Sequence, residues 1–165
     1  LVRNHRADIV VCGGDRVLPP EHAGAHEVAT TFAARFSGGV GVMQPIGHRT
    51  SMPAEQNLES PWVGRNFILR FYGGAGPYHE RYFQYFGNAE LAAVASRAGV
   101  LWYREDVAQP FVRPGEPDFY QRQNRDGYWN RDGVIFAERE KANFEGAEAS
   151  RIVTANSLYL PKLRE

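Results

Sequence analysis

The hydrophobic positions of this chain form short runs separated by glycine and proline, which predicts alternating strands and helices. Residues 8–12 are a continuous apolar run that ends at Gly13-Gly14, the pattern of a central strand buried on both faces of a sheet. Residues 21–36 place apolar side chains on one helical face, and residues 40–43 return as a second strand. Residues 8–43 therefore predict a βαβ unit. The fold class we expect is α/β, with a mainly parallel sheet flanked by helices.

The segment after the second predicted strand shows no regular period in its hydrophobic positions. Residues 44–61 are polar and contain spaced prolines, which predicts a long loop. Aromatic residues are dense in residues 78–86, where we expect a packed helix. Residues 88–98 predict a second helix, with Asn88 as its N-cap and Glu90 in the first turn, where the helix dipole favours an anion.

The last third of the chain continues the same alternation. Residues 100–103 are apolar and predict a further strand. Residues 118–144 are rich in aromatic and charged side chains, and we expect them to be partly helical with breaks near Gly127 and Gly133. We assign residues 1–145 to one domain and residues 146–165 to a tail of uncertain structure.

Composition narrows the functional classes. The 165 residues include 19 basic and 19 acidic side chains, and this balance does not indicate a nucleic-acid partner. No run approaches the 18 or so apolar residues of a membrane span, so we expect none. The single cysteine, Cys12, cannot form an internal disulfide, which favours a reducing, cytoplasmic location. Because the chain starts at Leu1 just before a strand, we expect that an amino-terminal half precedes it.

Residues 7–20 contain an acidic motif directly after the first apolar strand. The segment resembles the corresponding part of family-2 nucleotide-sugar glycosyltransferases, which have the GT-A fold. In that family, a pair of acidic residues holds a divalent ion, Mn or Mg, against the sugar diphosphate, and the metal offsets the charge of the leaving group. Asp15 matches the second acidic position, whereas Gly14 stands at the first. The resemblance implies that Asp15 is a metal ligand.

Two later segments resemble the acceptor-side region of the same family. They are residues 62–67, which include Trp62 and Arg65, and residues 82–91, which include Asn88 and Glu90. The resemblance implies that Glu90 is the catalytic base, and that Arg65 and Asn88 bind substrate. Trp62 borders the long loop, where its ring is a candidate platform for a sugar.

The resemblance implies that the protein transfers a sugar from a nucleotide-diphosphate donor to a hydroxyl of a glycan or another acceptor. This expected reaction is inverting and metal-assisted, and residues 1–145 would form the acceptor-side part of the enzyme. A second possibility is a non-catalytic, carbohydrate-binding or structural descendant, in which Glu90 only improves a helix start and Asn88 only caps it. A third possibility, a hydrolase, lacks a Gly-x-Ser-x-Gly motif.

Overall fold

Four strands and four helices make up the part of the chain that the computed structural model describes. The described residues are 6–13, 18, 20, 22–46, 58–110 and 127–145. The strands are β1 (Ile9–Val11), β2 (Val42–Ile46), β3 (Trp62–Gly64) and β4 (Leu101–Ala108). The helices are α1 (Ala25–Arg35), α2 (Arg65–Phe71), α3 (Gly87–Arg97) and α5 (Tyr128–Lys141). The α/β class is confirmed.

The sheet is mixed, so the expectation of a mainly parallel sheet was wrong. Its strand order is β1-β3-β2-β4. β3 pairs antiparallel with both β1 and β2, and only β2 and β4 form a parallel pair. β1 and β2 do run in the same direction, as a βαβ unit requires, but β3 lies between them. The hydrophobic pattern could not reveal this insertion because pairing between distant strands leaves no local periodicity.

The strand predicted at the centre of the sheet lies at its edge among the described residues. β1 pairs only with β3 there, and Val11 is 47% exposed. Val10, by contrast, is half-buried and packs against the core. Ile9 packs against a second hydrophobic cluster, so both faces of β1 are partly covered. A short apolar run is equally compatible with such an edge strand.

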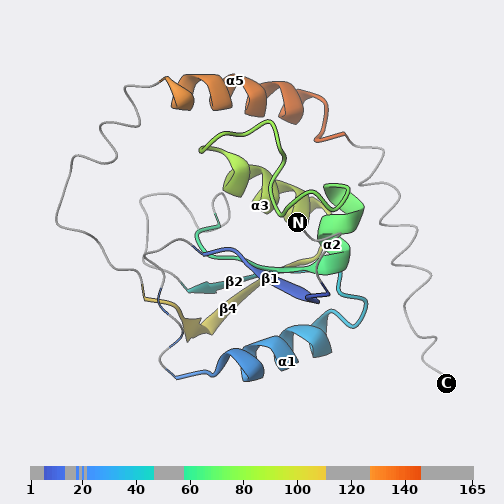
Figure 1. Ribbon diagram of the computed structural model, residues 1–165, viewed down its shortest axis with the longest axis vertical. Helices are drawn as coiled ribbons and strands as arrows, with labels where there is room; N and C mark the ends of the chain where they lie inside the picture. The colour runs from blue at the N-terminus through green and yellow to red at the C-terminus, as the bar shows by residue number, and fades with distance from the viewer. Residues whose placement is uncertain are drawn as a thin grey trace.

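The helices cover the sheet in layers (Figure 1). α1 lies on one face, α2 and α3 lie on the other, and α5 runs across the outside of α3. Two hydrophobic clusters fill the spaces between these layers. The cluster beneath α1 contains Val28, Phe32, Met43, Trp62 and Val107. The larger cluster beneath α2 and α3 contains Val42, Leu58, Val63, Phe67, Ile68, Phe71, Leu91, Ala92, Val94, Ala95, Val100 and Phe144.

Helix α3 confirms the helix predicted at residues 88–98, with a shift of one residue. Leu91, Val94 and Ala95 form its buried stripe. Its N-cap is Phe86, in the left-handed region at φ 65°, rather than Asn88. Asn88 therefore lies inside the first turn and does not cap the helix.

Residues 78–86 do not form the predicted helix. They make a series of bends and turns before α3. The backbone N–H groups of Phe83, Gln84 and Tyr85 donate to the carboxylate of Asp132 on α5, instead of to helical carbonyl groups. A distant side chain thus satisfies these donors, and the aromatic rings pack without a helix.

Two expectations for residues 118–144 had different outcomes. Gly127 is the N-cap of α5, at φ 71°, and marks a helix boundary as predicted. Gly133 lies inside α5 and does not break it; a Cβ there would come within 3.5 Å of the Phe86 ring.

No helix in the described ranges is long and apolar enough to cross a membrane. The predicted tail, residues 146–165, lies outside the described residues.

Candidate functional site

The carboxyl ends of three strands point toward one edge of the sheet. β1, β2 and β4 run in the same direction. β2 and β4 end together, where Ile46 pairs with Ala108, whereas β1 ends beside the start of β3, where Val11 pairs with Trp62. Trp62 also pairs with Met43, the second residue of β2, so Trp62 lies three residues before the end of that strand. In open α/β sheets, ligands bind outside the carboxyl ends of the strands. This carboxyl edge is therefore the first place to look for a site.

Four buried polar atoms without hydrogen-bond partners lie on the sheet or directly beside it. They belong to Gln44 in the middle of β2, to Ser60 and Trp62 at the entry to β3, and to Gln109 directly after β4. Their unpaired atoms are Gln44 Oε1, Ser60 Oγ, Trp62 Nε1 and Gln109 Oε1, and none has a partner among the described residues. Gln44 follows Met43 on β2, so its side chain points to the opposite face of the sheet from Met43 and Trp62, which belong to the cluster beneath α1. Leaving such an atom unpaired costs about 1–3 kcal/mol.

Trp62 contributes a hydrogen-bond donor rather than a stacking surface. Only 4% of the side chain is exposed, and the ring packs against the cluster beneath α1. Stacking on a sugar needs a free ring face, which this conformation does not offer. The indole Nε1–H is the group that Trp62 can present to a ligand.

Glu90 lies in a buried ion pair between α3 and α5. Arg139 Nε donates to Glu90 Oε2 at 2.7 Å, and Arg139 Nη2 donates to Oε1 at 2.8 Å. The Tyr82 hydroxyl donates to Oε2 at 2.7 Å. Glu90 is 1% exposed and Arg139 is 5% exposed. Both carboxylate oxygens are thus engaged, and Glu90 has a structural role between α3 and α5. This geometry does not favour the predicted role of Glu90 as a catalytic base.

The surroundings of this ion pair belong to the same network. Arg139 Nη1 donates to Glu145 Oε1 at 2.6 Å, which supplies a second carboxylate. Burial, together with the negative charge of Glu90, raises the pKa of the Tyr72 hydroxyl. Burial and the hydrogen bond to Glu90 also raise the pKa of Tyr82. Both phenols therefore stay neutral at physiological pH, and the network is a contact between helices.

Asp132 anchors the other end of α5. Its carboxylate is fully buried and accepts the backbone N–H groups of Phe83, Gln84 and Tyr85 at 3.1, 2.8 and 2.8 Å. Burial alone would raise the pKa of Asp132, but these hydrogen bonds outweigh burial and the pKa lies below its usual value of 3.8. Asp132 and Arg139 are seven residues apart and lie on one face of α5.

The other residues predicted to form a site are not gathered at one place. Arg65 is the first residue of α2, and its N–H donates to the Asp8 carbonyl beside the start of β1. It therefore lies beyond the opposite end of β3 from Trp62. Asn88 is half-buried in the first turn of α3. Asp15 lies outside the described residues.

The described residues do not supply a metal site. None of them form a group of three or more His, Cys, Asp or Glu side chains that could hold an ion. Asp15 as a ligand of Mn or Mg stays a prediction. We therefore assign no step of a reaction to a metal.

Sequence reasoning missed Asp132 and Arg139. Both are charged side chains on a helix that is otherwise strongly polar, so nothing in the local pattern separates them from solvated neighbours. The only signal was their spacing with Ile135, which puts all three on one helical face.

The sequence analysis used Cys12 only as an indicator of a reducing location. In the structure, burial raises the pKa of the Cys12 thiol to about 12, although Tyr78 hydrogen-bonds to it.

Comparison with protein families, with curated proteins and with solved structures finds no significant match to this chain. The family resemblance therefore rests on the sequence motifs alone. Function has to be argued from the fold and the chemistry of the carboxyl edge.

Proposed function

We propose that this protein is a glycosyltransferase of the GT-A type, which moves a sugar from a nucleotide-diphosphate donor to an acceptor hydroxyl. The observation that carries the proposal is the presence of two unpaired polar groups at the entry to β3, Ser60 Oγ and Trp62 Nε1–H, beside the end of β1. Sugars and ribose present hydroxyl groups that both donate and accept hydrogen bonds. Such ligands complement one oxygen atom and one N–H group better than an apolar ligand would.

The position of these atoms also supports the proposal. The acidic motif that resembles the transferases ends in Asp15, four residues after β1, and β1 ends at the carboxyl edge. A donor diphosphate near Asp15 and an acceptor near Trp62 would then approach the same edge. Arg65 and Asn88 lie away from Trp62, and we leave their substrate contacts as predictions.

In the proposed reaction, the acceptor oxygen attacks the anomeric carbon, and the bond from that carbon to the diphosphate oxygen breaks. The nucleoside diphosphate leaves, and the acceptor hydroxyl loses its proton. Glu90 is held by Arg139 and Tyr82, so we do not propose it as the proton acceptor. Asn88 has no basic group. We propose no residue for this step.

A second candidate function is carbohydrate binding without transfer. The ion pair of Glu90 with Arg139 favours it, because the motif that resembles a catalytic one then serves to join α3 and α5. Both candidates use the carboxyl edge. They differ in whether the donor is consumed.

The test is to incubate the protein with a panel of nucleotide-diphosphate sugars, Mn²⁺ and glycan acceptors, and to measure released nucleoside diphosphate. Trp62→Phe removes the Nε1–H but keeps a ring in the core. We expect KM for the acceptor to rise about threefold to tenfold, as for the loss of one hydrogen bond. Trp129→Phe is the control, since Trp129 lies on α5 and packs against Tyr85 and Phe86.

The outcomes separate the candidates. Turnover that depends on Trp62 and not on Trp129 supports the transferase. Binding of a glycan without consumption of any donor supports the second candidate. Equal effects of the two tryptophan substitutions would rule out the carboxyl edge as the ligand site for both candidate functions.

A further inference from the structure

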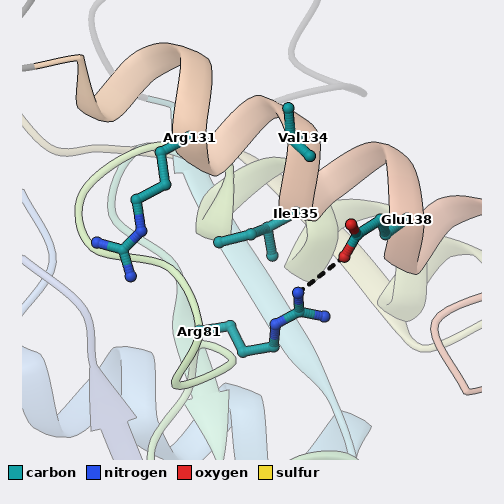
Figure 2. A pocket seen from close by; sticks show the side chains of 5 residues that line it. All are labelled: Arg81, Arg131, Val134, Ile135 and Glu138. Carbon is teal, nitrogen blue, oxygen red and sulfur yellow. Dashed lines mark hydrogen bonds and ion pairs between the residues drawn. The ribbon is translucent and has the colours of Figure 1, made fainter.

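A pocket of about 530 Å³ lies between α5 and the turn that contains Arg81 (Figure 2). Its lining residues are Arg81, Arg131, Val134, Ile135 and Glu138. This volume is in the range of small-molecule sites. We name this space the α5 pocket. It contains none of the residues that the resemblance implies, and none of the unpaired atoms of the carboxyl edge.

Two guanidinium groups flank the α5 pocket. Arg131 extends from α5 and Arg81 extends from the turn below, with Ile135 between them (Figure 2). Arg81 Nη2 forms an ion pair with Glu138 Oε2 at 2.8 Å. Arg131 forms no ion pair with a carboxylate of the described residues; its guanidinium carbon lies 5.9 Å from the Phe83 ring centre. Its positive charge acts on the buried carboxylate of Asp132, the neighbouring residue on α5, which three backbone N–H groups already satisfy.

The floor of the α5 pocket is apolar. Ile135 is 8% exposed, whereas Val134 is 60% exposed beside it. Phe83, which Arg131 covers, is 61% exposed. Exposed apolar side chains next to an exposed guanidinium complement a ligand that offers both an anion and an apolar body.

We propose that the α5 pocket binds an organic oxyanion, a carboxylate or a phosphate carried on an apolar or ring-shaped body. Arg131 receives the anionic group, and the body lies over Val134 and Ile135. A planar guanidinium matches the paired oxygens of either group. The proposal goes beyond the glycosyltransferase function and does not depend on it.

Glu138 sets the strength of this site. Its carboxylate holds Arg81 and lies at the rim of the α5 pocket, so it competes with an incoming anion for that guanidinium. With Glu138 neutral, both arginines would be available to one ligand. Removal of this carboxylate should therefore strengthen binding of the anion. A non-specific effect of surface charge would not depend on this one position.

The experiment is an NMR titration of the arginine Nε–H signals at constant ionic strength. The probes are benzoate and acetate for the carboxylate arm, and phenyl phosphate and inorganic phosphate for the phosphate arm. We expect the ring-bearing probe of at least one arm to shift Arg131 and Arg81 with a Kd at least threefold lower than its partner without a ring. The arm with the lower Kd identifies the anionic group.

Three substitutions test the assignment. Arg131→Gln should raise Kd about fivefold, the upper range for an exposed ion pair. Glu138→Gln should lower Kd by a similar factor, and Val134→Asp should abolish binding. Arg35→Gln, on α1 across the sheet, is the control and should leave Kd unchanged. The proposal is overturned if no ring-bearing probe shifts these signals, or if Arg131→Gln and Arg35→Gln have equal effects.

Discussion

At the scale of single residues, the ion pair of Glu90 with Arg139 makes the sharpest prediction. Glu90→Gln keeps the shape of the side chain but leaves Arg139 buried with only the exposed Glu145 as its charge partner. Breaking a buried pair costs about 3–5 kcal/mol, because the remaining charge is not compensated. We expect the free energy of unfolding in urea to fall by this amount.

The matched control is Glu138→Gln. Glu138 also forms an arginine ion pair, with Arg81, but both side chains are about half exposed. Exposed pairs contribute about 0–1 kcal/mol. If Glu90→Gln is as stable as the wild type and loses only transferase activity, the structural role argued here is wrong and the catalytic role predicted from the sequence is right.

Asp132 predicts a pH dependence of stability. Its pKa is lowered in the folded state, so its contribution is complete above the unfolded pKa of about 3.9 and is lost as pH falls through the folded pKa. Asp132→Asn should cost about 2 kcal/mol at pH 7 and should flatten the dependence of the urea midpoint between about pH 5 and pH 2.

Glu140→Gln, an exposed change on the same helix, is the control for Asp132 and should alter stability by less than about 0.5 kcal/mol. An unchanged pH profile in Asp132→Asn would show that the three backbone N–H bonds contribute little. The account would then need another anchor for the start of α5.

At the scale of elements, Gly64 marks a close approach between β3 and the turn before β2. A Cβ at Gly64 would come closer than 3.0 Å to the carbonyl oxygen of Gly39, which is backbone and cannot rotate away. We expect Gly64→Ala to cost about 1–3 kcal/mol, the usual range for overpacking. Gly38→Ala is the control, because a Cβ there meets nothing within 4 Å. Equal thermal unfolding midpoints for the two variants would contradict this packing.

The elements also show which predictions a sequence can support. Helix α3 was predictable because its stripe of Leu91, Val94 and Ala95 is local. The turns at residues 78–86 were not, because Asp132, 47 to 49 residues away, takes up their N–H groups. The insertion of β3 between β1 and β2 was equally hidden, since it depends on pairing between Val63 and two distant strands.

At the scale of the whole molecule, the outer side of β1 predicts self-association. The Asp8 carbonyl accepts the N–H of Arg65 and the Cys12 N–H donates to Pro61, the residues on either side of β3, so the alternate residues Ile9 and Val11 direct their backbone groups away from it. No strand in the described ranges pairs with that side. Unpaired edges are templates for another chain.

We therefore expect the 165-residue chain to associate as concentration rises, and Val11→Lys to reduce this association. Sedimentation equilibrium measures both. Val134→Lys, a change at an exposed valine of α5, is the control and should leave association unchanged. A wild-type chain that stays monomeric at high concentration would contradict the prediction.

The same distinction between local patterns and distant contacts applies to the residues of the candidate site. The acidic motif after β1 and Trp62 at the start of β3 could be picked out of the sequence, and the register places Trp62 beside the end of β1. The partners of Glu90 could not be predicted, because Arg139 lies 49 residues away on a helix with a polar pattern. The residues that a motif singles out can thus serve stability instead of chemistry.

Ligand binding at Trp62 can be followed directly through the indole N–H signals of the three tryptophans by NMR. The 165-residue chain is titrated with a nucleoside diphosphate plus Mg²⁺, and then with a methyl glycoside. The account predicts that the Trp62 signal shifts, because its Nε1–H has no partner among the described residues and a hydroxyl-rich ligand would accept it. Trp129, which lies on α5, should not move. A Trp62 signal unchanged by every ligand, or a shift confined to Trp129, would contradict a ligand site at the carboxyl edge.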